Sequence, residues 1–373
     1  MRGIRLGSVF GLEIRIDYSW FIIFFLILWT LTAGVFPGSA PDLGTGTYMV
    51  MGVVGTVLFF VSILAHEVSH SLVAQQRGVP VEGITLFIFG GMAHTRMEAE
   101  DPADEFVIAG VGPLSSLLIA AGFAVLAWVG RSAGLGPEYT AVADYLALIN
   151  VALAVFNLLP GFPLDGGRLF RAAAWKLTGD LQQATRWATT GGKVLGYVLM
   201  ALGLLQLFAG AGIGGLWLIF IGWFVRTAAE SSFMQHVLHR TLEGVPVRRL
   251  MTPDPEAVPS SLSLREFVDD RVMNGRHRAY PVVEGSRPVG LVSLDQVRNV
   301  PRDDWPERTV GDVMTAADAD LVVHPDEDMA SVLERLAGRE GVRLLVLDHG
   351  ELVGVLTRGD LTRWIERARL LEG

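Results

Sequence analysis

The sequence predicts a multi-pass α-helical membrane protein of about six spans with short membrane-associated β-strands, followed by a C-terminal α/β domain. Two observations lead to this fold class. Of the 373 residues, 51% are hydrophobic and only 18% are charged, which is too apolar for an ordinary soluble enzyme. The long uncharged runs all lie before about Glu230, and the remaining residues have the composition of a water-soluble domain. At least two domains are therefore expected.

The expected domains follow this change in composition. They are a membrane domain over residues 1–230, a linker helix over 231–245, and two repeats over 246–300 and 308–369. Six segments approach the roughly 20 mostly apolar residues that a spanning helix needs. These segments are Trp20–Phe36, Tyr48–Ala74, Phe106–Gly130, Ala141–Pro160, Val194–Phe208 and Ile213–Val225. The last two are short, and we expect them to form a tight pair.

Basic residues near the span ends predict the orientation, because Lys and Arg favour the cytoplasmic face. Most of them fall on the side shared by both termini, whereas the opposite loop over residues 37–47 has none. The sequence thus predicts a multi-pass protein of the cell membrane, in contact with the lipid bilayer, with both termini and the repeats in the cytoplasm. The net charge of −9 and the absence of a basic stripe in the sequence argue against direct nucleic-acid binding.

The second predicted span contains SILAHEVSHSLVAQ, which places His66, Glu67 and His70 in an otherwise uncharged stretch. Ionisable groups inside a span are costly and are usually functional. Positions i and i+4 share a helix face, so the two histidines can offer imidazole nitrogens to one zinc ion. Glu67 would then lie beside the metal as a general base. A chance match to H-E-x-x-H is the alternative, which the membrane location makes the weaker one.

Two histidines leave a catalytic zinc one protein ligand short. The chain has no cysteine, so the third ligand must be His, Asp or Glu. Asp165 is the only carboxylate in FNLLPGFPLDGGRLFRA, and the predicted topology puts it at the depth of the two histidines. The Pro and Gly residues of this run are expected to break the helix, which is tolerated where the backbone lines a cavity. A turn or helix cap is the alternative role for this residue.

The motifs HEVSH and NLLPGFPLDGGR closely resemble the paired signatures of the site-2 protease family of intramembrane zinc metalloproteases. The intervening FGGMAHTRMEAEDPADEFVIAGVGPLSS is also similar to that family. The resemblance implies one zinc ion bound by His66, His70 and Asp165, with Glu67 as general base. It also implies that Asn157 positions the substrate or stabilises the oxyanion. The implied activity is hydrolysis within or near transmembrane segments of membrane-anchored proteins, such as membrane-anchored transcription regulators, in regulated intramembrane proteolysis.

The stretch VPVEGITLFIFGGMAHTRM is rich in β-branched and aromatic residues with glycine breaks, which predicts short strands or a hairpin. Such strands could pair with an unwound substrate, and a loop packed only for structure is the alternative. His94 within the stretch is expected to be hydrogen-bonded rather than an extra ligand. Arg168 and Arg171 are expected to contact phosphate headgroups or nearby carboxylates, and anchoring at the membrane interface is the preferred role. The small residues Gly110, Gly112, Pro113, Ser115 and Ser116 are interpreted as a helix-packing face.

The C-terminal part contains two similar copies, one with RAYPVVEGSRPVGLVSLDQV and one with RLLVLDHGELVGVLTRGDL. Each predicts strand, helix, strand, turn, strand and helix, and the pair resembles cystathionine-β-synthase (CBS) repeats, which one branch of the protease family carries. The resemblance implies an adenine nucleotide contacted by Thr357 and Asp360. The first copy has Gln296 where the acid would lie. A packing domain without ligand, or a homodimer formed through these repeats, is the open alternative.

The main rival function is a transporter or channel gated by the same repeats. A pore needs polar residues along its length, whereas the ionisable residues here gather at one depth. A catalytically silent membrane scaffold is a third hypothesis, but every catalytic position of the resemblance is present. The sequence therefore favours a zinc metalloendopeptidase.

Overall fold

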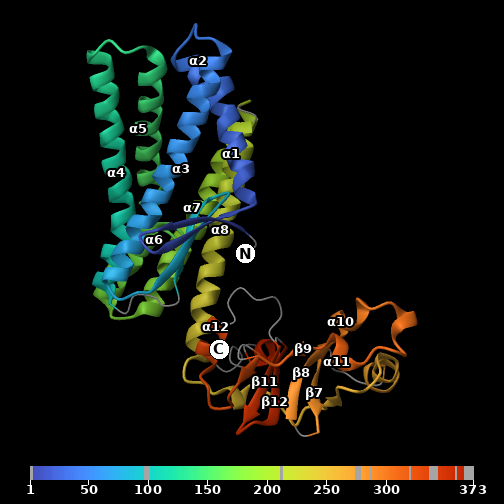
Figure 1. Ribbon diagram of the computed structural model, residues 1–373. Helices are drawn as coiled ribbons and strands as arrows, with labels where there is room; N and C mark the ends of the chain where they lie inside the picture. Colours follow the sequence, from blue (N-terminus) through green and yellow to red (C-terminus); the bar gives the residue numbers. More distant parts are fainter. Residues whose placement is uncertain are drawn as a thin grey trace. The chain divides into compact units, whose positions relative to one another are not determined.

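The computed structural model describes residues 3–95, 101–210, 213–273, 279–285, 287–318, 321–335, 343–357 and 359–364. The chain divides into two compact units, Met1–Met234 and Gln235–Gly373. Figure 1 shows the first as a set of long helices with a small sheet, and the second as an α/β unit.

The first unit consists mainly of long helices. Their bounds are α1 (Ser19–Thr30), the π-helical η1 (Leu31–Val35), α2 (Phe36–Ser39), α3 (Thr45–Gln76), α4 (Pro102–Ser132), α5 (Pro137–Asn157), α6 (Asp165–Thr178), α7 (Leu181–Phe208) and α8 (Ile213–Leu242). Over the described residues, five segments are long and apolar enough to cross a membrane: Ser19–Ser39, α3, α4, α5 and α7. The multi-pass helical fold is thus confirmed. The sixth predicted span forms the first part of α8, which is not among these five, so the count of six stays a prediction.

The helices that contain the last two predicted spans are longer than those apolar segments. Helix α7 begins at Leu181, because the Asp180 carboxylate accepts hydrogen bonds from the backbone N–H groups of Gln182 and Gln183 and so caps the helix. Its first turns are too polar to be recognised by hydropathy. Helices α7 and α8 do pack tightly: a Cβ added at Gly196 would lie 2.7 Å from the carbonyl oxygen of Gly222. Small residues allow this backbone contact.

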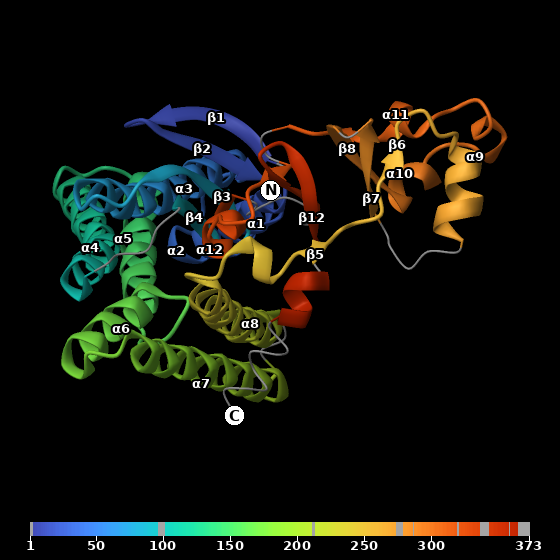
Figure 2. The ribbon, with the colours of Figure 1, turned by 90° about the horizontal axis from the view of Figure 1, so that it is seen from below.

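Helices α3, α4 and α5 pack side by side, and the short helix α6 contacts α4 and α7 (Figures 1 and 2). A four-stranded sheet packs against α3. Its strands are β1 (Gly3–Val9), β2 (Leu12–Asp17), β3 (Val81–Phe87) and β4 (Gly90–Thr95), in the order β1-β2-β3-β4. The β2–β3 pair is parallel and the other two pairs are antiparallel. The β3–β4 hairpin confirms the predicted membrane-associated strands, and β4 is an edge strand.

Strands β1 and β2 were not predicted. The signal is present in GLEIRID, where Leu12, Ile14 and Ile16 alternate with polar residues. All three are buried in one core with Ile84 of β3 and Phe60 of α3. The sheet is thereby held against the helix that carries HEVSH.

The second unit contains two four-stranded sheets. One has the order β10 (Val322–Val323), β11 (Arg343–Asp348), β12 (Glu351–Thr357) and β5 (Thr252–Pro253). The other has the order β6 (Val258–Pro259), β7 (Ala279–Glu284), β8 (Arg287–Ser293) and β9 (Thr315–Ala316). The short helices are η2 (Val247–Arg249), α9 (Leu264–Glu266), η3 (Phe267–Val272), α10 (Leu294–Arg298), η4 (Arg302–Asp304), α11 (Val310–Val313) and α12 (Met329–Arg335).

Each repeat lends one strand to the sheet of the other. Strand β5, from the first repeat, pairs with β12, and β9, which begins the second repeat, pairs with β8. Each sheet nevertheless has its own apolar core, one around Val346 and one around Val282. The two repeats are therefore interlocked and form one unit.

Candidate metal centre

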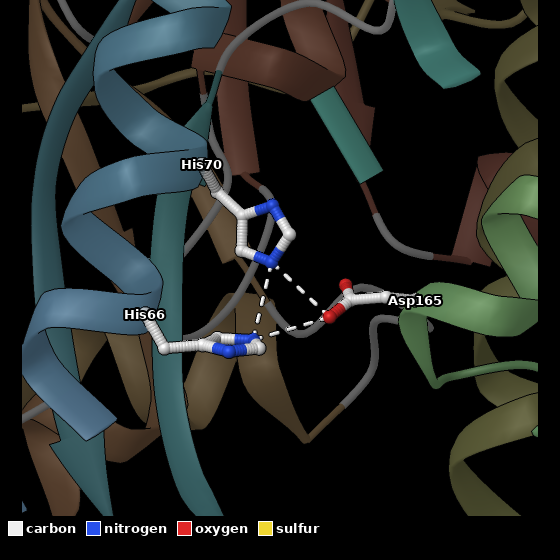
Figure 3. Close-up of side chains that lie close together, drawn as sticks. All are labelled: His66, His70 and Asp165. Carbon is white, nitrogen blue, oxygen red and sulfur yellow. Dashed lines mark hydrogen bonds and ion pairs between the residues drawn. The ribbon is translucent and has the colours of Figure 1, made fainter. Parts of the chain in front are cut away.

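Three candidate ligands from two helices converge at one point. His66 and His70 project from one face of α3 toward Asp165, the first residue of α6 (Figure 3). The two Nε2 atoms lie 3.2 Å apart, and each lies 3.1 Å from Asp165 Oδ2. Both histidines are buried. The structure thus brings together the three residues that the sequence singled out.

A tight loop delivers Asp165 to this point. Helix α5 ends at Asn157, and the chain turns through residues 158–164 before α6 begins. A Cβ at Gly166 would lie 2.3 Å from the carbonyl carbon of Leu158, and one at Gly167 would lie 2.3 Å from that of Gly161. These glycines are required because backbone passes directly over them. The predicted helix break is present, and Asp165 begins a new helix after it.

Helix α4 contacts the outer nitrogen, Nδ1, of each histidine ring, which is the nitrogen that faces away from the cluster. His70 Nδ1 donates to the carbonyl oxygen of Ile108 at 2.6 Å, and His66 Nδ1 lies 2.9 Å from the buried hydroxyl oxygen of Ser116. A carbonyl can only accept, so in the neutral ring of His70 the lone pair is on Nε2 and faces the cluster. Metal-binding histidines are held in this way, with the distal ring nitrogen bonded to a carbonyl or another polar group.

Gly112 of α4 leaves the space that the two rings occupy. A Cβ at this position would lie 2.1 Å from His70 Nε2 and 2.8 Å from His66 Nε2. The interpretation of Gly112 and Ser116 as a packing face alone was therefore incomplete, because that face of α4 reaches the histidines. Neither the carbonyl of Ile108 nor the room above Gly112 has a signature in the sequence.

The cluster fits a zinc ion. With zinc–nitrogen and zinc–oxygen bonds of about 2.0–2.2 Å in tetrahedral geometry, ligand atoms lie about 3.3 Å apart. The observed separations of 3.1–3.2 Å agree with this value. Among the described residues, the group of His, Asp and Glu side chains at this point contains three members. Three protein ligands leave a fourth position for water, as in catalytic rather than structural zinc sites.

Glu67 and Asn157 are close in sequence to the metal-ligand candidates, but Glu67 contacts the sheet and Asn157 contacts its own helix. Glu67 follows His66 on α3, and a Cβ at Gly91 would lie 2.3 Å from its Cγ. The Glu67 side chain therefore lies against the backbone of the edge strand β4. Asn157 ends α5, and its Nδ2 donates to the carbonyl oxygen of Leu153 at 3.1 Å. Among the contacts of the described residues, none joins Asn157 to the cluster.

Two other predictions about this region have different outcomes. The preferred role of Arg171 as an interface anchor is wrong and the carboxylate alternative is confirmed, because Arg171 is buried and its Nε donates to Glu105 Oε1 at 2.7 Å. Arg168 is partly exposed and lies 3.9 Å from the same oxygen. The backbone of His94 lies in β4, but its side chain lies outside the described part of the chain.

In the second unit, Asp360 is buried between two threonines. Its Oδ2 accepts from the Thr357 backbone N–H at 2.8 Å and from the Thr357 hydroxyl at 2.6 Å. Its Oδ1 accepts from the Thr252 hydroxyl at 2.9 Å. The carboxylate thus joins β12 to the strand exchanged from the first repeat.

Gln296 occupies the corresponding place in the first repeat. Its Oε1 accepts from the backbone N–H and the hydroxyl of Ser293, and its Nε2 donates to the Thr315 hydroxyl at 2.8 Å. The amide preserves the contacts of the carboxylate with one hydrogen bond reversed. The departure at Gln296 therefore keeps the local fold and removes one negative charge.

Comparison with known proteins covers both units. Residues 54–132 and 129–202 match peptidase family M50, and residues 247–303 and 310–367 match the CBS domain. A solved structure, the site-2 protease of Methanocaldococcus jannaschii, is 27% identical over 62% of this chain and 95% of its own, with a TM-score of 0.44.

Relatives are similar over nearly the whole chain. Rip3 of Mycobacterium tuberculosis, a protein named as a zinc metalloprotease, is 37% identical over 372 residues, covering 99% of this chain and 94% of Rip3. The zinc metalloprotease MJ0392 of Methanocaldococcus jannaschii is 30% identical over 369 residues, covering 99% and 98%. These findings confirm the metalloprotease class. The chain belongs to peptidase family M50, the site-2 protease family, and carries a pair of CBS domains after its protease unit.

Proposed function

We propose that the chain is an intramembrane zinc metalloprotease that hydrolyses peptide bonds in or near the transmembrane segments of membrane-anchored proteins. One zinc ion is held by His66 Nε2, His70 Nε2 and the Asp165 carboxylate. The convergence of these atoms at zinc-ligand spacing, within a unit of long apolar helices, carries the proposal. The names of the relatives, which are zinc metalloproteases, also support it.

The residues of the chain divide the chemistry between them. When bound, zinc supplies Lewis-acid chemistry, since it lowers the pKa of a coordinated water molecule and polarises the scissile carbonyl. Glu67 would serve as the general base that takes a proton from the attacking water and as the acid that returns it to the leaving amine. Asn157 binds the substrate backbone or the oxyanion, because its amide carries a second N–H besides the one donated to Leu153.

Strand β4 presents the substrate to Glu67. A transmembrane substrate arrives as a helix, and its backbone must be extended for hydrolysis. Among the described strands β4 pairs only with β3, so its outer edge offers N–H and C=O groups to an added strand. The contact between Glu67 and Gly91 puts this edge next to the proposed base.

The central experiment uses purified full-length protein with a single-span peptide, with and without a zinc chelator. Glu67→Gln is the matched control, because it keeps the size of the side chain and removes the base. Cleavage by the wild type alone, with one zinc ion retained in the variant, is the expected result. Undiminished cleavage by Glu67→Gln would remove this residue from the mechanism.

We propose that the protein lies in the cell membrane with both termini and the CBS domains in the cytoplasm. The basic residues near the span ends support this orientation. Because the natural chain has no cysteine, single cysteines introduced into successive loops can be labelled from either side without background. Labelling of a cysteine in the loop over residues 41–44 from the cytoplasm would contradict the orientation.

We propose that an adenine nucleotide binds the CBS unit at Thr357 and Asp360 and regulates the protease. In the structure the Asp360 carboxylate accepts from Thr357, Thr252 and Arg363, so a ribose hydroxyl would bind by replacing one of these donors. Gln296 lacks this charge, so the first repeat is the weaker site. Calorimetric titration of the full-length protein with ATP, ADP and AMP, with Asp360→Asn as control, tests the proposal. No heat with any nucleotide would favour a packing or homodimerisation role.

A further inference from the structure

One face of α4 organises the metal centre. Glu105, Ile108, Gly112 and Ser116 follow one another at intervals of three or four residues, so they lie on the same side of the helix. The carbonyl of Ile108 and the hydroxyl of Ser116 hold the outer nitrogens of the two histidines. Gly112 leaves room for their inner nitrogens. Glu105, at the start of this face, contacts α6 instead of the histidines of α3.

Glu105 ties α4 to the helix that begins with Asp165. Its Oε1 accepts from Arg171 Nε at 2.7 Å and lies 2.5 Å from Arg171 Nη2. Glu105 is 1% exposed and Arg171 is 7% exposed. The Arg171 guanidinium also lies over the ring of Phe162, 5.1 Å from its centroid. One guanidinium therefore holds both α6 and the loop that leads to Asp165.

Asp165, the third ligand, depends more on such tertiary contacts for its position than the two histidines do. His66 and His70 belong to one helix, so the helical backbone sets their separation. Asp165 comes from another helix, behind a Pro- and Gly-rich loop, and nothing local sets its distance from the imidazoles. A functional constellation must be held within about 0.5 Å of its working geometry.

We propose that Glu105 and Arg171 form a positioning pair that sets the place of the Asp165 carboxylate relative to the two imidazole nitrogens. The inference rests on the metal site of the proposed function. A buried ion pair is seldom a net source of stability, because desolvation offsets the attraction of its charges. Here we expect the pair to fix the orientation of α6, because Nε and Nη2 of the Arg171 guanidinium both contact the same oxygen, Oε1 of Glu105. Helix α4 thus acts as one template for all three ligands.

The test compares two ion pairs on the same helix. Glu105→Asp and Arg171→Lys keep the charges, so neither leaves a buried charge without a partner, but each changes the geometry of the pair. Arg131→Lys is the matched control, because Arg131 of α4 pairs with Asp144 of α5 and both side chains are about half exposed. Zinc affinity is measured on the full-length protein by competition with a chelator. The visible absorption spectrum of the cobalt-loaded protein reports the ligand geometry.

The expected result is a zinc affinity lower by about 10- to 100-fold in both variants, as for other groups that orient metal ligands, with an altered cobalt spectrum. Arg131→Lys should match the wild type in both measurements. Wild-type affinity and spectrum in both Glu105→Asp and Arg171→Lys would overturn the proposal.

A double variant covers the case in which the single variants fail to fold. Glu105→Met with Arg171→Met replaces the pair by apolar side chains and leaves no unpaired charge, which proteins often tolerate. If this double variant folds and binds zinc as the wild type does, the pair only stabilises the fold and the inference is wrong. A wild-type protein that binds no zinc would instead refute the proposed function, so the two failures are distinguishable.

Discussion

Replacing Gly112 by alanine should disrupt the metal centre through a single added methyl group. The new Cβ would lie 2.1 Å from His70 Nε2, whereas real Cβ atoms essentially never make a non-bonded contact closer than 3.0 Å. The ring must therefore move by at least the difference, about 0.9 Å, which exceeds the tolerance of about 0.5 Å for a working site.

His70 cannot make this movement without cost, because its Nδ1 is held by the carbonyl oxygen of Ile108 at 2.6 Å. Losing that hydrogen bond in a buried site costs about 1–3 kcal/mol. That cost lowers the stability of the folded protein, and the displaced His70 should also bind zinc about 10- to 100-fold more weakly, as when other groups that orient metal ligands are lost.

Gly110→Ala on the same helix is the control. Outside its own helix, a Cβ there would have its nearest neighbour, Leu169 Cδ2, at 3.8 Å, which is an ordinary contact. Zinc affinity by chelator competition, proteolysis of a single-span peptide and thermal unfolding should be measured for both variants. Wild-type zinc affinity and cleavage in Gly112→Ala would show that α4 does not limit the position of the histidine rings.

Four further predictions test the centre and its substrate edge. Glu67→Gln should keep one zinc ion, measured by elemental analysis, and lower the rate of peptide cleavage by about 10²- to 10⁴-fold, because only the general base is lost. Asp165→Ala should lower the bound zinc well below one per chain, and unchanged stoichiometry would exclude it as a ligand. Ser116→Ala should weaken zinc binding by about tenfold, measured by chelator competition, because the outer nitrogen of His66 loses its partner. Met92→Pro and Ala93→Pro each remove one N–H of β4. Successive N–H groups of a strand alternate in direction, so one of these variants loses an inward-facing N–H, which points toward β3, and the other loses an outward-facing N–H at the free edge. The outward-facing variant should lose cleavage while keeping its zinc, and full activity in both would argue against strand addition.

Local patterns in the sequence were sufficient to identify the three candidate ligands. His66 and His70 are four residues apart in an apolar helix, and helical geometry alone puts them on one face. The Pro and Gly residues before Asp165 predict the end of α5, because proline lacks the backbone N–H that continues a helix and glycine has a low helix propensity. The β3–β4 hairpin was likewise readable from β-branched residues and glycines.

The tertiary structure alone decided what surrounds these ligands. Arg171 meets Glu105 across 66 residues of sequence, and neither residue carries a local sign of the other. Ile108 acts through a backbone carbonyl, which every residue has, and Gly112 acts through the absence of a side chain. The exchange of β5 and β9 between the CBS domains is also invisible locally. Residue spacing along a helix or strand specifies which groups share a face, whereas the partner of that face depends on how distant elements pack. The sequence by itself therefore determined the ligand types and their helical setting, and only the packing of α4 against α3 and α6 determined how they are held together.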